Sequence, residues 1–374
     1  MGIKENMLNG GDVEMLESAV RICRGYLQGA WKRITPQDVT VKRLSGGLSN
    51  ILYHVELNSP EDATRPKQVL LRLYGQTHGE GALENLITES VIFTLLSERK
   101  IGPKLFGIFP GGRIEEYLPA SPLKPEEMSD PELNPLVAEK VAAVHCMNVP
   151  INKEPRWIWD TIQRWLNTIE DTTPSNNPIE QELLTHDLQG ELDWLKSHLS
   201  KVPSPVVFCH NDLQQGNILR HNASRDQIVI IDFEYCAYNY RGFDLANHFM
   251  EWTYDYTKPE FPYFGIHKDR YSSPQQMKKF IEVYLQALIA NGNVVKPELN
   301  NVKSIMKEIK HYTLATHLLW SVWAIVQARV SKITFGYCEF AQERLTCYYK
   351  LKNEILAGSK EQICAVKRKV IELD

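Results

Sequence analysis

The sequence predicts an α+β fold with two lobes, a small β-rich N-terminal lobe and a larger, mostly helical C-terminal lobe. Three observations lead to this prediction. Short runs rich in β-branched residues fill the first part of the chain, whereas longer segments with helical periodicity fill the rest. A polar, proline-rich stretch at residues 121–135 separates the two patterns and is expected to be a connector. The 374 residues suffice for two lobes around a cleft, which we place at residues 1–118 and 119–374.

The N-terminal lobe is expected to begin with a helix. After a polar end at residues 1–12, apolar side chains recur on one face of residues 13–27, and Gly29 ends the pattern. The elements that follow are strand, strand, strand, helix and strand, at residues 39–44, 51–57, 68–74, 83–99 and 113–118. This order is typical of a small nucleotide-binding lobe.

The C-terminal lobe combines helices with two short buried strands. Helical periodicity is found at residues 136–147, 158–169, 181–199, 275–290, 303–330 and 340–356. The apolar runs at residues 205–208 and 228–231 are rich in β-branched side chains and predict buried strands between these helices. A loop between two buried strands would hold its polar side chains firmly.

That loop carries the strongest chemical signal in the chain. Asp212 and Asn217 lie five residues apart within it, and Asp232 ends the second strand. The catalytic loop of protein kinases has the same Asp-x-x-x-x-Asn spacing. In that chemistry Asp212 orients an acceptor hydroxyl and takes its proton, while Asn217 and Asp232 give oxygen ligands to Mg²⁺. The segment therefore predicts an ATP-dependent phosphotransferase.

Each part of this signal also has a plainer explanation. Asn-Asp and Gly-Asn pairs form turns, and an aspartate at a strand end often only caps the strand. The two segments together, in this order and between strands, favour the phosphotransferase. His210 is expected to brace the loop by hydrogen bonds, because Asp212 already fills the role of the base.

The N-terminal lobe offers candidate phosphate ligands. The turn at residues 45–50 contains two glycines, which let backbone N–H groups approach phosphate oxygens, although an ordinary hairpin has the same composition. Arg72 lies in the third predicted strand, where a buried arginine needs a negative partner. The phosphates of ATP are one candidate partner and Glu89 is another, and a purely structural Arg–Glu pair is the alternative. Residues 115–119 would link the lobes and offer backbone groups to adenine.

Aromatic residues gather in the C-terminal half near a carboxylate. Trp320 and Trp323 lie three residues apart on a predicted helix and therefore share a face, and Phe335 and Phe340 follow. Aromatic faces attract quaternary ammonium ions, and Glu251 would add a Coulombic attraction. A tryptophan-rich core is the alternative. We favour a cage for a cation, because the catalytic loop requires a small hydroxyl-bearing acceptor.

Composition narrows the class of protein further. A net charge of −4 argues against a nucleic-acid partner. Seven cysteines, an odd number without a CxxC pair, indicate free thiols in a reducing compartment. We expect no membrane insertion, since no apolar run reaches spanning length and the N-terminus lacks a signal-peptide core. The expected location is the cytoplasm.

Several long and specific segments point to one family. They are residues 45–50, 69–75, 101–105, 204–212, 231–235, 238–244, 247–249 and 335–337. With them the chain resembles the choline/ethanolamine kinases, and more closely the choline kinases, over nearly its whole length. The resemblance implies a protein-kinase-like fold and Mg²⁺-dependent transfer of the γ-phosphoryl group of ATP to choline, on the route to phosphatidylcholine. It also implies some ethanolamine kinase activity and a homodimer.

The resemblance assigns a role to each matching residue. Asp212 is the base, Asn217 and Asp232 are the metal ligands, and Asp244 braces the catalytic loop. The residues expected to bind ATP are Ser45, Gly46, Gly47, Leu48, Ser49, Asn50, Ile51, Arg72, Glu116, Tyr117, Leu118, Gln214 and Asp232. The residues expected to bind choline are Glu234, Tyr235, Glu251, Tyr256, Trp320, Trp323, Phe335 and Phe340.

Some alternatives stay open. The aromatic residues that follow Glu251 favour choline over ethanolamine, but an ethanolamine-preferring kinase is an alternative. An aminoglycoside-type phosphotransferase would use the same fold, although an acceptor with many amines calls for an acidic pocket. A catalytically inactive nucleotide-binding module is the third alternative, and the full catalytic set argues against it. Two residues depart from the family: Gln215 replaces a usual glutamate, and Phe340 replaces a common tyrosine, which keeps the ring face but loses a hydroxyl.

Overall fold

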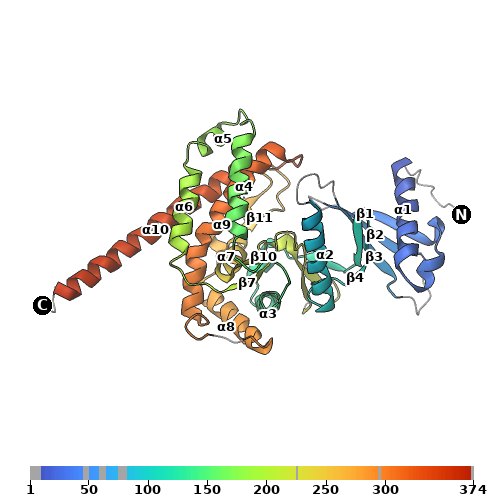
Figure 1. Cartoon of the computed structure of the whole chain (residues 1–374), viewed down its shortest axis with the longest axis horizontal. Coiled ribbons are helices and arrows are strands. Elements are labelled where there is room, and N and C mark those ends of the chain that lie inside the picture. The colour runs from blue at the N-terminus through green and yellow to red at the C-terminus, as the bar shows by residue number, and fades with distance from the viewer. Residues whose placement is uncertain are drawn as a thin grey trace. The chain divides into compact units, whose positions relative to one another are not determined.

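The computed structural model in Figure 1 describes residues 10–44, 50–58, 65–74, 82–224, 226–293 and 296–371. The chain divides into two units. Unit 1 contains residues 1–121, 221–225 and 229–231, and unit 2 contains residues 122–220, 226–228 and 232–374. Unit 1 is built on an antiparallel sheet and unit 2 mainly on helices, which confirms the predicted fold class.

The sheet of unit 1 has five strands in the order β1-β2-β3-β5-β4. These strands are β1 (Val39–Leu44), β2 (Asn50–Leu57), β3 (Gln68–Tyr74), β4 (Leu105–Phe109) and β5 (Gly112–Glu116). The first three match the predicted strands closely, and β5 ends two residues before its predicted end at 118. The sequence analysis missed β4, although Gly111, with φ of 89°, marks the tight turn that joins it to β5.

Alternation along the strands gives the sheet two different faces. Val69 and Leu71 on β3 and Ile114 on β5 are fully buried and form a core with helix α1 (Gly10–Tyr26). Arg72 lies on the opposite face of the sheet. Helix α2 (Ala82–Glu98) belongs to that second face, and in Figure 1 the sheet lies between α1 and α2. Two short 3₁₀ helices, η1 (Gly29–Arg33) and η2 (Pro36–Asp38), connect α1 to β1.

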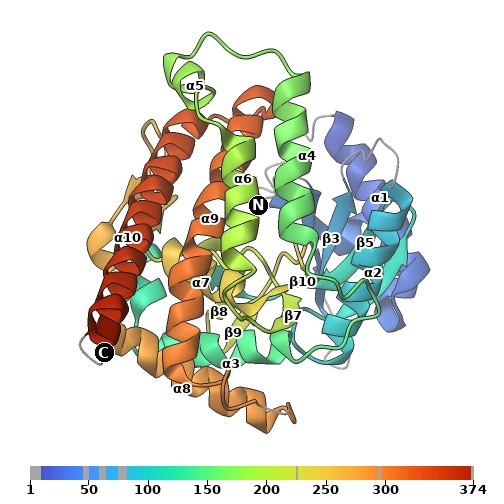
Figure 2. The ribbon, with the colours of Figure 1, turned by 60° about the vertical axis from the view of Figure 1, so that its left-hand side comes forward.

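Unit 2 is organised around one long helix. Helix α9 (Val302–Val330) is buried along most of its length, and α4, α6, α7, α8 and α10 all pack on it. Figure 2 shows α10 and α6 on either side of α9. The helices are α3 (Leu133–His145), α4 (Trp157–Asp171), α5 (Pro178–Leu183), α6 (Leu188–Leu199), α7 (Arg241–Glu251), α8 (Pro274–Ala290) and α10 (Tyr337–Ile371). Among the described residues, no helix has a stretch both long and apolar enough to span a membrane.

Three helical predictions need correction. The single helix predicted at residues 181–199 is two helices, because Asp187 caps the second by accepting the backbone N–H of Gly190 at 2.9 Å. Helix α7 was not predicted, although its polar residues Arg241, Asp244, His248 and Glu251 recur at helical spacing; all of them are buried. Helix α10 begins before and continues beyond the predicted 340–356.

The strands that follow β5 in the described residues form three small sheets. β7 (Val206–Cys209) pairs with β10 (Ala237–Tyr240), and β11 (Tyr254–Asp255) pairs with β12 (Gly265–Ile266). The third sheet has the order β6-β8-β9, from β6 (Ala120–Pro122), β8 (Ile218–His221) and β9 (Ile228–Ile230). The strands predicted at 205–208 and 228–231 correspond to β7 and β9. They belong to different sheets, so the loop between them contains η4 (Gln215–Asn217) and β8 as well.

Candidate active site

The segment after β7 has an unusual backbone conformation that buried hydrogen bonds hold in place. Asn211 has φ of 68°, in the left-handed region that non-glycine residues rarely adopt. Asp244, in the first turn of α7, accepts the backbone N–H groups of His210 and Asn211, each at 2.8 Å. The Asn211 side chain donates to the carbonyl of Tyr235 at 2.8 Å. These contacts confirm that Asp244 braces the loop that carries Asp212.

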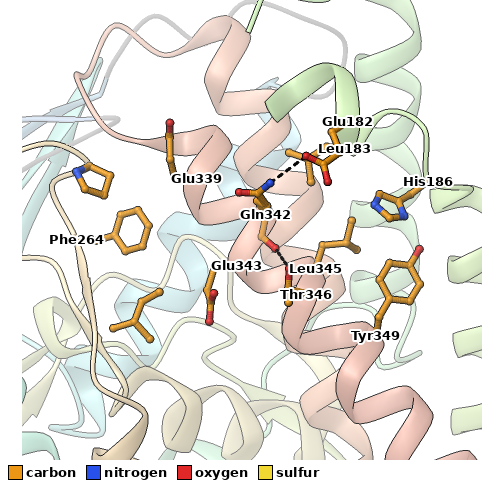
Figure 3. Close-up of a pocket in the computed structure, with 12 residues that line it drawn as sticks. Glu182, Leu183, His186, Phe264, Glu339, Gln342, Glu343, Leu345, Thr346 and Tyr349 are labelled. Atoms are coloured by element: carbon orange, nitrogen blue, oxygen red, sulfur yellow. Dashed lines mark hydrogen bonds between the residues drawn. The ribbon is translucent and has the colours of Figure 1, made fainter. Parts of the chain in front are cut away.

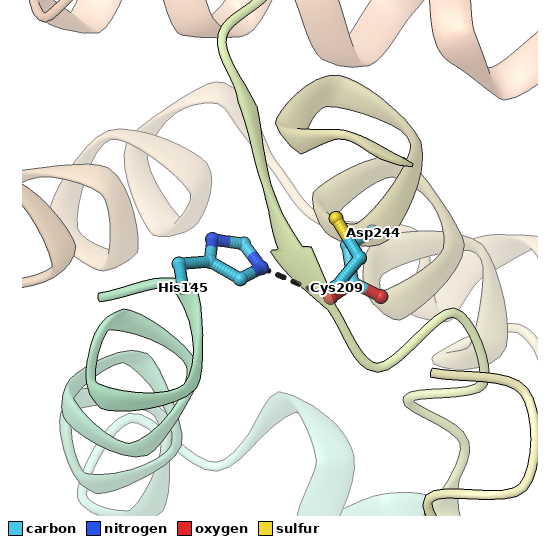
Figure 4. Close-up of side chains that lie close together, drawn as sticks. All are labelled: His145, Cys209 and Asp244. Carbon is cyan, nitrogen blue, oxygen red and sulfur yellow. Dashed lines mark hydrogen bonds and ion pairs between the residues drawn. The ribbon is translucent and has the colours of Figure 1, made fainter. Parts of the chain in front are cut away.

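The carboxylate of Asp244 lies in a fully buried cluster with His145 and Cys209 (Figure 4). His145 Nε2 is 2.9 Å from Asp244 Oδ2. Burial alone would raise the pKa of Asp244, but its hydrogen bond and attraction to His145 lower the pKa below its usual value. Burial raises the pKa of Cys209 far above its usual value, so its thiol keeps its proton. Since a metal would need the thiolate, we assign the cluster a structural role.

Asp212 and Asn217 are in direct contact. The Asn217 amide nitrogen donates to the backbone carbonyl of Asp212 at 2.9 Å and to its carboxylate Oδ2 at 2.8 Å. The backbone N–H of Asp212 donates to His210 Nδ1 at 3.2 Å, which confirms the bracing role expected of His210. Because nitrogen is the atom that holds Asp212, the amide oxygen of Asn217 is left for another partner, such as a hard cation.

The carboxylate of Asp212 lies among other acidic groups. Burial raises the pKa of Asp212 well above its usual value, and repulsion from Glu251, Asp232 and Glu234 raises it further. Asp232 has φ of 64°, so a second residue of the predicted catalytic set has a left-handed backbone. Glu234 is exposed, whereas Asp232 is half-buried. Acidic groups that repel one another form an oxygen-rich site, which suits Mg²⁺.

In unit 1, Glu89, one of the two candidate partners of Arg72, does not pair with it. Arg72 Nε binds Glu115 Oε1 at 2.6 Å, and it is Arg113 that binds Glu89, at 2.5 Å. The register of the sheet explains why Arg113, and not Arg72, pairs with Glu89, because Arg72 lies directly opposite Arg113 in the β3–β5 pair. Glu115 also accepts from Arg113 Nε at 2.7 Å and so bridges two cations that would otherwise repel.

The other residues predicted to bind ATP are found in varied settings. Ser45, Gly46, Gly47, Leu48 and Ser49 lie outside the described residues, as does the side chain of Asn50. Ile51 is exposed on β2, and Glu116 and Leu118 are half-buried. Tyr117 stacks on His54 with ring centroids 3.9 Å apart. Gln214 Oε1 accepts the N–H of Gly216 at 2.6 Å and so caps the η4 turn within the loop itself.

The aromatic residues predicted to bind the acceptor form one connected cluster in unit 2. Ring centroids are 6.0 Å apart for Tyr235 and Trp320, and 5.5 Å for Trp320 and Trp323. Phe340 connects these rings to the remaining ones, with centroids 6.5 Å from Trp323 and 5.9 Å from Phe335. Tyr256 lies 6.4 Å from Phe335 and 6.2 Å from Phe340. Trp323, Tyr235, Tyr256 and Phe335 are only half-buried, so the cluster is not simply core.

Glu251, predicted to attract the acceptor, has an internal partner that the sequence analysis missed. Arg344 on α10 forms an ion pair with Glu251 Oε1, and the Tyr256 hydroxyl donates to Oε2 at 2.8 Å. Arg344 is completely buried, which is rare for an arginine. The sequence indicated the burial of Arg344 but not its partner, because Arg344 lies four residues after Phe340 on the apolar face of a predicted helix.

Two cavities adjoin the outer side of this cluster. One, of about 610 Å³, is lined by Phe264 and by Glu182, Glu339 and Glu343, with Gln342 donating to Glu182 at 3.2 Å (Figure 3). The other, of about 1090 Å³, is lined by Tyr254 and several lysines of α9 and α10. Phe264 and Tyr254 each pack on Phe340, with ring centroids 5.4 Å apart. These two rings are therefore walls that the cluster shares with the cavities.

Most of the chain is similar to one family of known proteins. Residues 41–349 match the family described as choline/ethanolamine kinase. A choline/ethanolamine kinase of Rattus norvegicus is 43% identical over 90% of this chain and 86% of that protein. Choline kinase alpha of Mus musculus is 39% identical over 89% of this chain and 80% of that protein.

The similarity extends to solved structures. The crystal structure of a choline kinase from Cryptosporidium parvum Iowa II superposes with a TM-score of 0.75 and 27% sequence identity. The match covers 93% of this chain and 97% of that one. It confirms the predicted protein-kinase-like fold.

Proposed function

The chain belongs to the choline/ethanolamine kinase family, and from this premise we propose that it transfers the γ-phosphoryl group of ATP to choline, with ethanolamine as a weaker acceptor. One observation supports the proposal most directly. Asn211, next to Asp212, donates to the backbone of Tyr235, whose ring contacts Trp320. The catalytic loop and the aromatic cluster are thus joined through one residue, within one unit. The reaction is a step of phospholipid biosynthesis.

In this proposal Asp212 positions the choline hydroxyl and accepts its proton. Burial and neighbouring carboxylates make Asp212 a stronger base than an exposed aspartate. Asn217 fixes the carboxylate by binding Oδ2 at 2.8 Å, so that the other oxygen, Oδ1, is left for the hydroxyl. Phosphoryl transfer depends mainly on such positioning, since the transferred group needs little covalent assistance.

Asn217 and Asp232 would hold Mg²⁺. Their donor set fits, because it supplies oxygen ligands from an amide and a carboxylate in an acidic setting. When bound, Mg²⁺ neutralises phosphate charge and orients the phosphates. In unit 1, Arg72 would bind phosphate oxygens, and Glu115 would orient its guanidinium.

The aromatic cluster would bind the cationic end of choline. A cation over an aromatic face gains about 0.5–2 kcal/mol per ring, with more in a poorly hydrated pocket. Trp320 is held for this task, since its indole N–H donates to Asn247 at 2.7 Å. The primary ammonium of ethanolamine is more strongly hydrated and presents N–H donors, so ring faces alone serve it less well. A homodimer stays a prediction.

An acceptor panel tests the proposal. The purified chain is incubated with γ-labelled ATP and Mg²⁺, and with choline, ethanolamine or an aminoglycoside in separate reactions. We expect labelled phosphocholine as the main product, a smaller yield of phosphoethanolamine and no labelled aminoglycoside, with turnover abolished by EDTA and restored by Mg²⁺. An aminoglycoside product, or no product with either amino alcohol, would refute the proposal.

A further inference from the structure

We propose that Arg344 is a positioning residue that sets the preference for choline over ethanolamine, because it occupies Glu251 and leaves the aromatic pocket to recognise its cation through ring faces. The inference rests on the proposed function of the same site. It reverses the role that the sequence suggested for Glu251, which was to attract the acceptor directly.

Both carboxylate oxygens of Glu251 already have partners. Oε1 accepts from Arg344 Nη2, and Oε2 accepts from the Tyr256 hydroxyl at 2.8 Å. Glu251 is 3% exposed and Arg344 is 0% exposed, so the ion pair is hardly screened by water. The pair is neutral as a whole, and an arriving ammonium group finds no free carboxylate there.

Arg344 lies behind the rings that would face the ligand. Its guanidinium carbon is 3.9 Å from the ring centroid of Tyr254 and 4.9 Å from that of Phe340. Phe340 in turn contacts Trp323, Phe335 and Tyr256 in the cluster. The arginine is therefore in a second layer, where it is held by one carboxylate and two ring faces.

The guanidinium group of Arg344 does not use all of its hydrogen-bond donors. Nε and Nη1 of Arg344 are buried and have no hydrogen-bond partner among the described residues. A guanidinium carries five N–H donors, and only Nη2 is used for Glu251. Arg329 also has one buried nitrogen without a partner among the described residues, so the distinguishing feature of Arg344 lies elsewhere. The charge of Arg344 cancels that of Glu251 directly behind the ring of Phe340.

The consequence for the two acceptors follows from their chemistry. A primary ammonium carries N–H donors that lose water on entering the pocket and need acceptors there. A trimethylammonium group has no N–H donor and loses no hydrogen bond. With Glu251 occupied, ethanolamine is expected to bind more weakly than choline by about 10- to 100-fold, as is typical of an unpaired buried donor.

The test replaces Arg344 and measures the ratio of kcat/KM for choline to kcat/KM for ethanolamine. Arg344→Met keeps an unbranched side chain of similar length but frees the charge of Glu251. We expect the ratio of kcat/KM for choline over ethanolamine to fall about 10-fold or more, through a lower KM for ethanolamine, since the ammonium is remote from the reacting hydroxyl. Adding Glu251→Gln in the double variant R344M/E251Q removes the freed charge and should restore the wild-type ratio.

A matched control separates recognition from general damage. Arg329 forms another buried ion pair, with Glu180 at 2.6 Å, and its side chain is 4% exposed. Arg329→Met should change kcat/KM for both acceptors by the same factor and leave their ratio unchanged. If R344M also changes both acceptors by one factor, Arg344 is only structural and the inference is overturned.

The remaining outcomes are also decisive. If R344M does not fold, the double variant R344M/E251Q carries the test, because a buried ion pair replaced on both sides avoids an unpaired charge. The wild type and R344M/E251Q both lack a free charge at position 251. If their ratios of kcat/KM for choline over ethanolamine differ by more than about 5-fold, the inference is overturned. Wild-type protein that phosphorylates neither acceptor would instead refute the proposed function.

Discussion

The stability of unit 2 should depend on pH through one buried histidine. His248 on α7 is 1% exposed. Its Nε2 accepts from the indole N–H of Trp252 at 3.3 Å, so the proton of the neutral ring lies on Nδ1 and faces the carbonyl of Leu213, also at 3.3 Å. Protonation of Nε2 would place two N–H groups against each other. Leu213 follows Asp212, so this histidine also supports the catalytic loop.

The size of the effect can be worked out from the shift in pKa. Burial lowers the pKa of His248 from 6.5 to about 4, against the smaller opposing effects of the Leu213 carbonyl and Asp244. Because the folded pKa is the lower one, His248 adds stability above pH 6.5, and this is lost as the pH falls toward 4. Between pH 7 and pH 5 the unfolded state gains the proton and the folded state does not, which costs about 2 kcal/mol.

The measurement compares urea unfolding of wild type and His248→Gln at pH 7 and pH 5. Glutamine can accept from Trp252 and donate to Leu213, but it does not titrate. We expect the free energy of unfolding of the wild type to fall by about 2 kcal/mol more than that of the variant. Other histidines with a lowered pKa, such as His311 and His317, are present in both proteins and cancel in the comparison. Equal losses in the two proteins would show that His248 is not held neutral by the fold.

Two predictions concern the reaction itself. Asp212→Asn keeps a hydrogen-bond partner for Asn217 but removes the base, so kcat should fall by about 10²–10⁴-fold. The ATP affinity, measured by calorimetry, should stay within about 3-fold of the wild type. Turnover near the wild-type level would reject Asp212 as the base. Trp323→Ala removes a half-buried ring whose centroid lies 5.5 Å from that of Trp320. In steady-state assays the KM for choline should rise by about 5- to 30-fold and the KM for ethanolamine by less. Equal increases would indicate damage to the core.

The parts of the site that the sequence predicted are those encoded locally. Asp212 and Asn217 lie within one loop, and their spacing placed them together, although the hydrogen bonds between them were not predicted. Trp320 and Trp323 lie on one helical face, so their contact followed from helix geometry. Strands with clear boundaries, such as β1 and β3, were also predicted closely.

The parts that were missed depend on contacts between distant segments. Glu89, one of two candidate partners for Arg72, pairs with Arg113 instead, because the β3–β5 register brings Arg113 opposite Arg72. Arg344 and Glu251 are 93 residues apart, and nothing in either local pattern indicates the other. Helix α7 was missed although its sequence has helical periodicity, and its polar side is buried because distant segments supply the partners, such as Glu308 for Arg241 and His145 for Asp244.

A permanent counter-ion for Glu251 also suits the release of product. If the ammonium group of the substrate neutralised this buried carboxylate, each departure of product would leave an unpaired charge in a poorly hydrated pocket, at a cost of several kcal/mol. Such a pocket would hold its product tightly. Under the proposed role, Arg344 would remain paired with Glu251, and the net charge beneath the rings would be the same whether the pocket is full or empty. Aromatic faces would then supply an attraction that is moderate and reversible, as an acceptor site with repeated turnover requires.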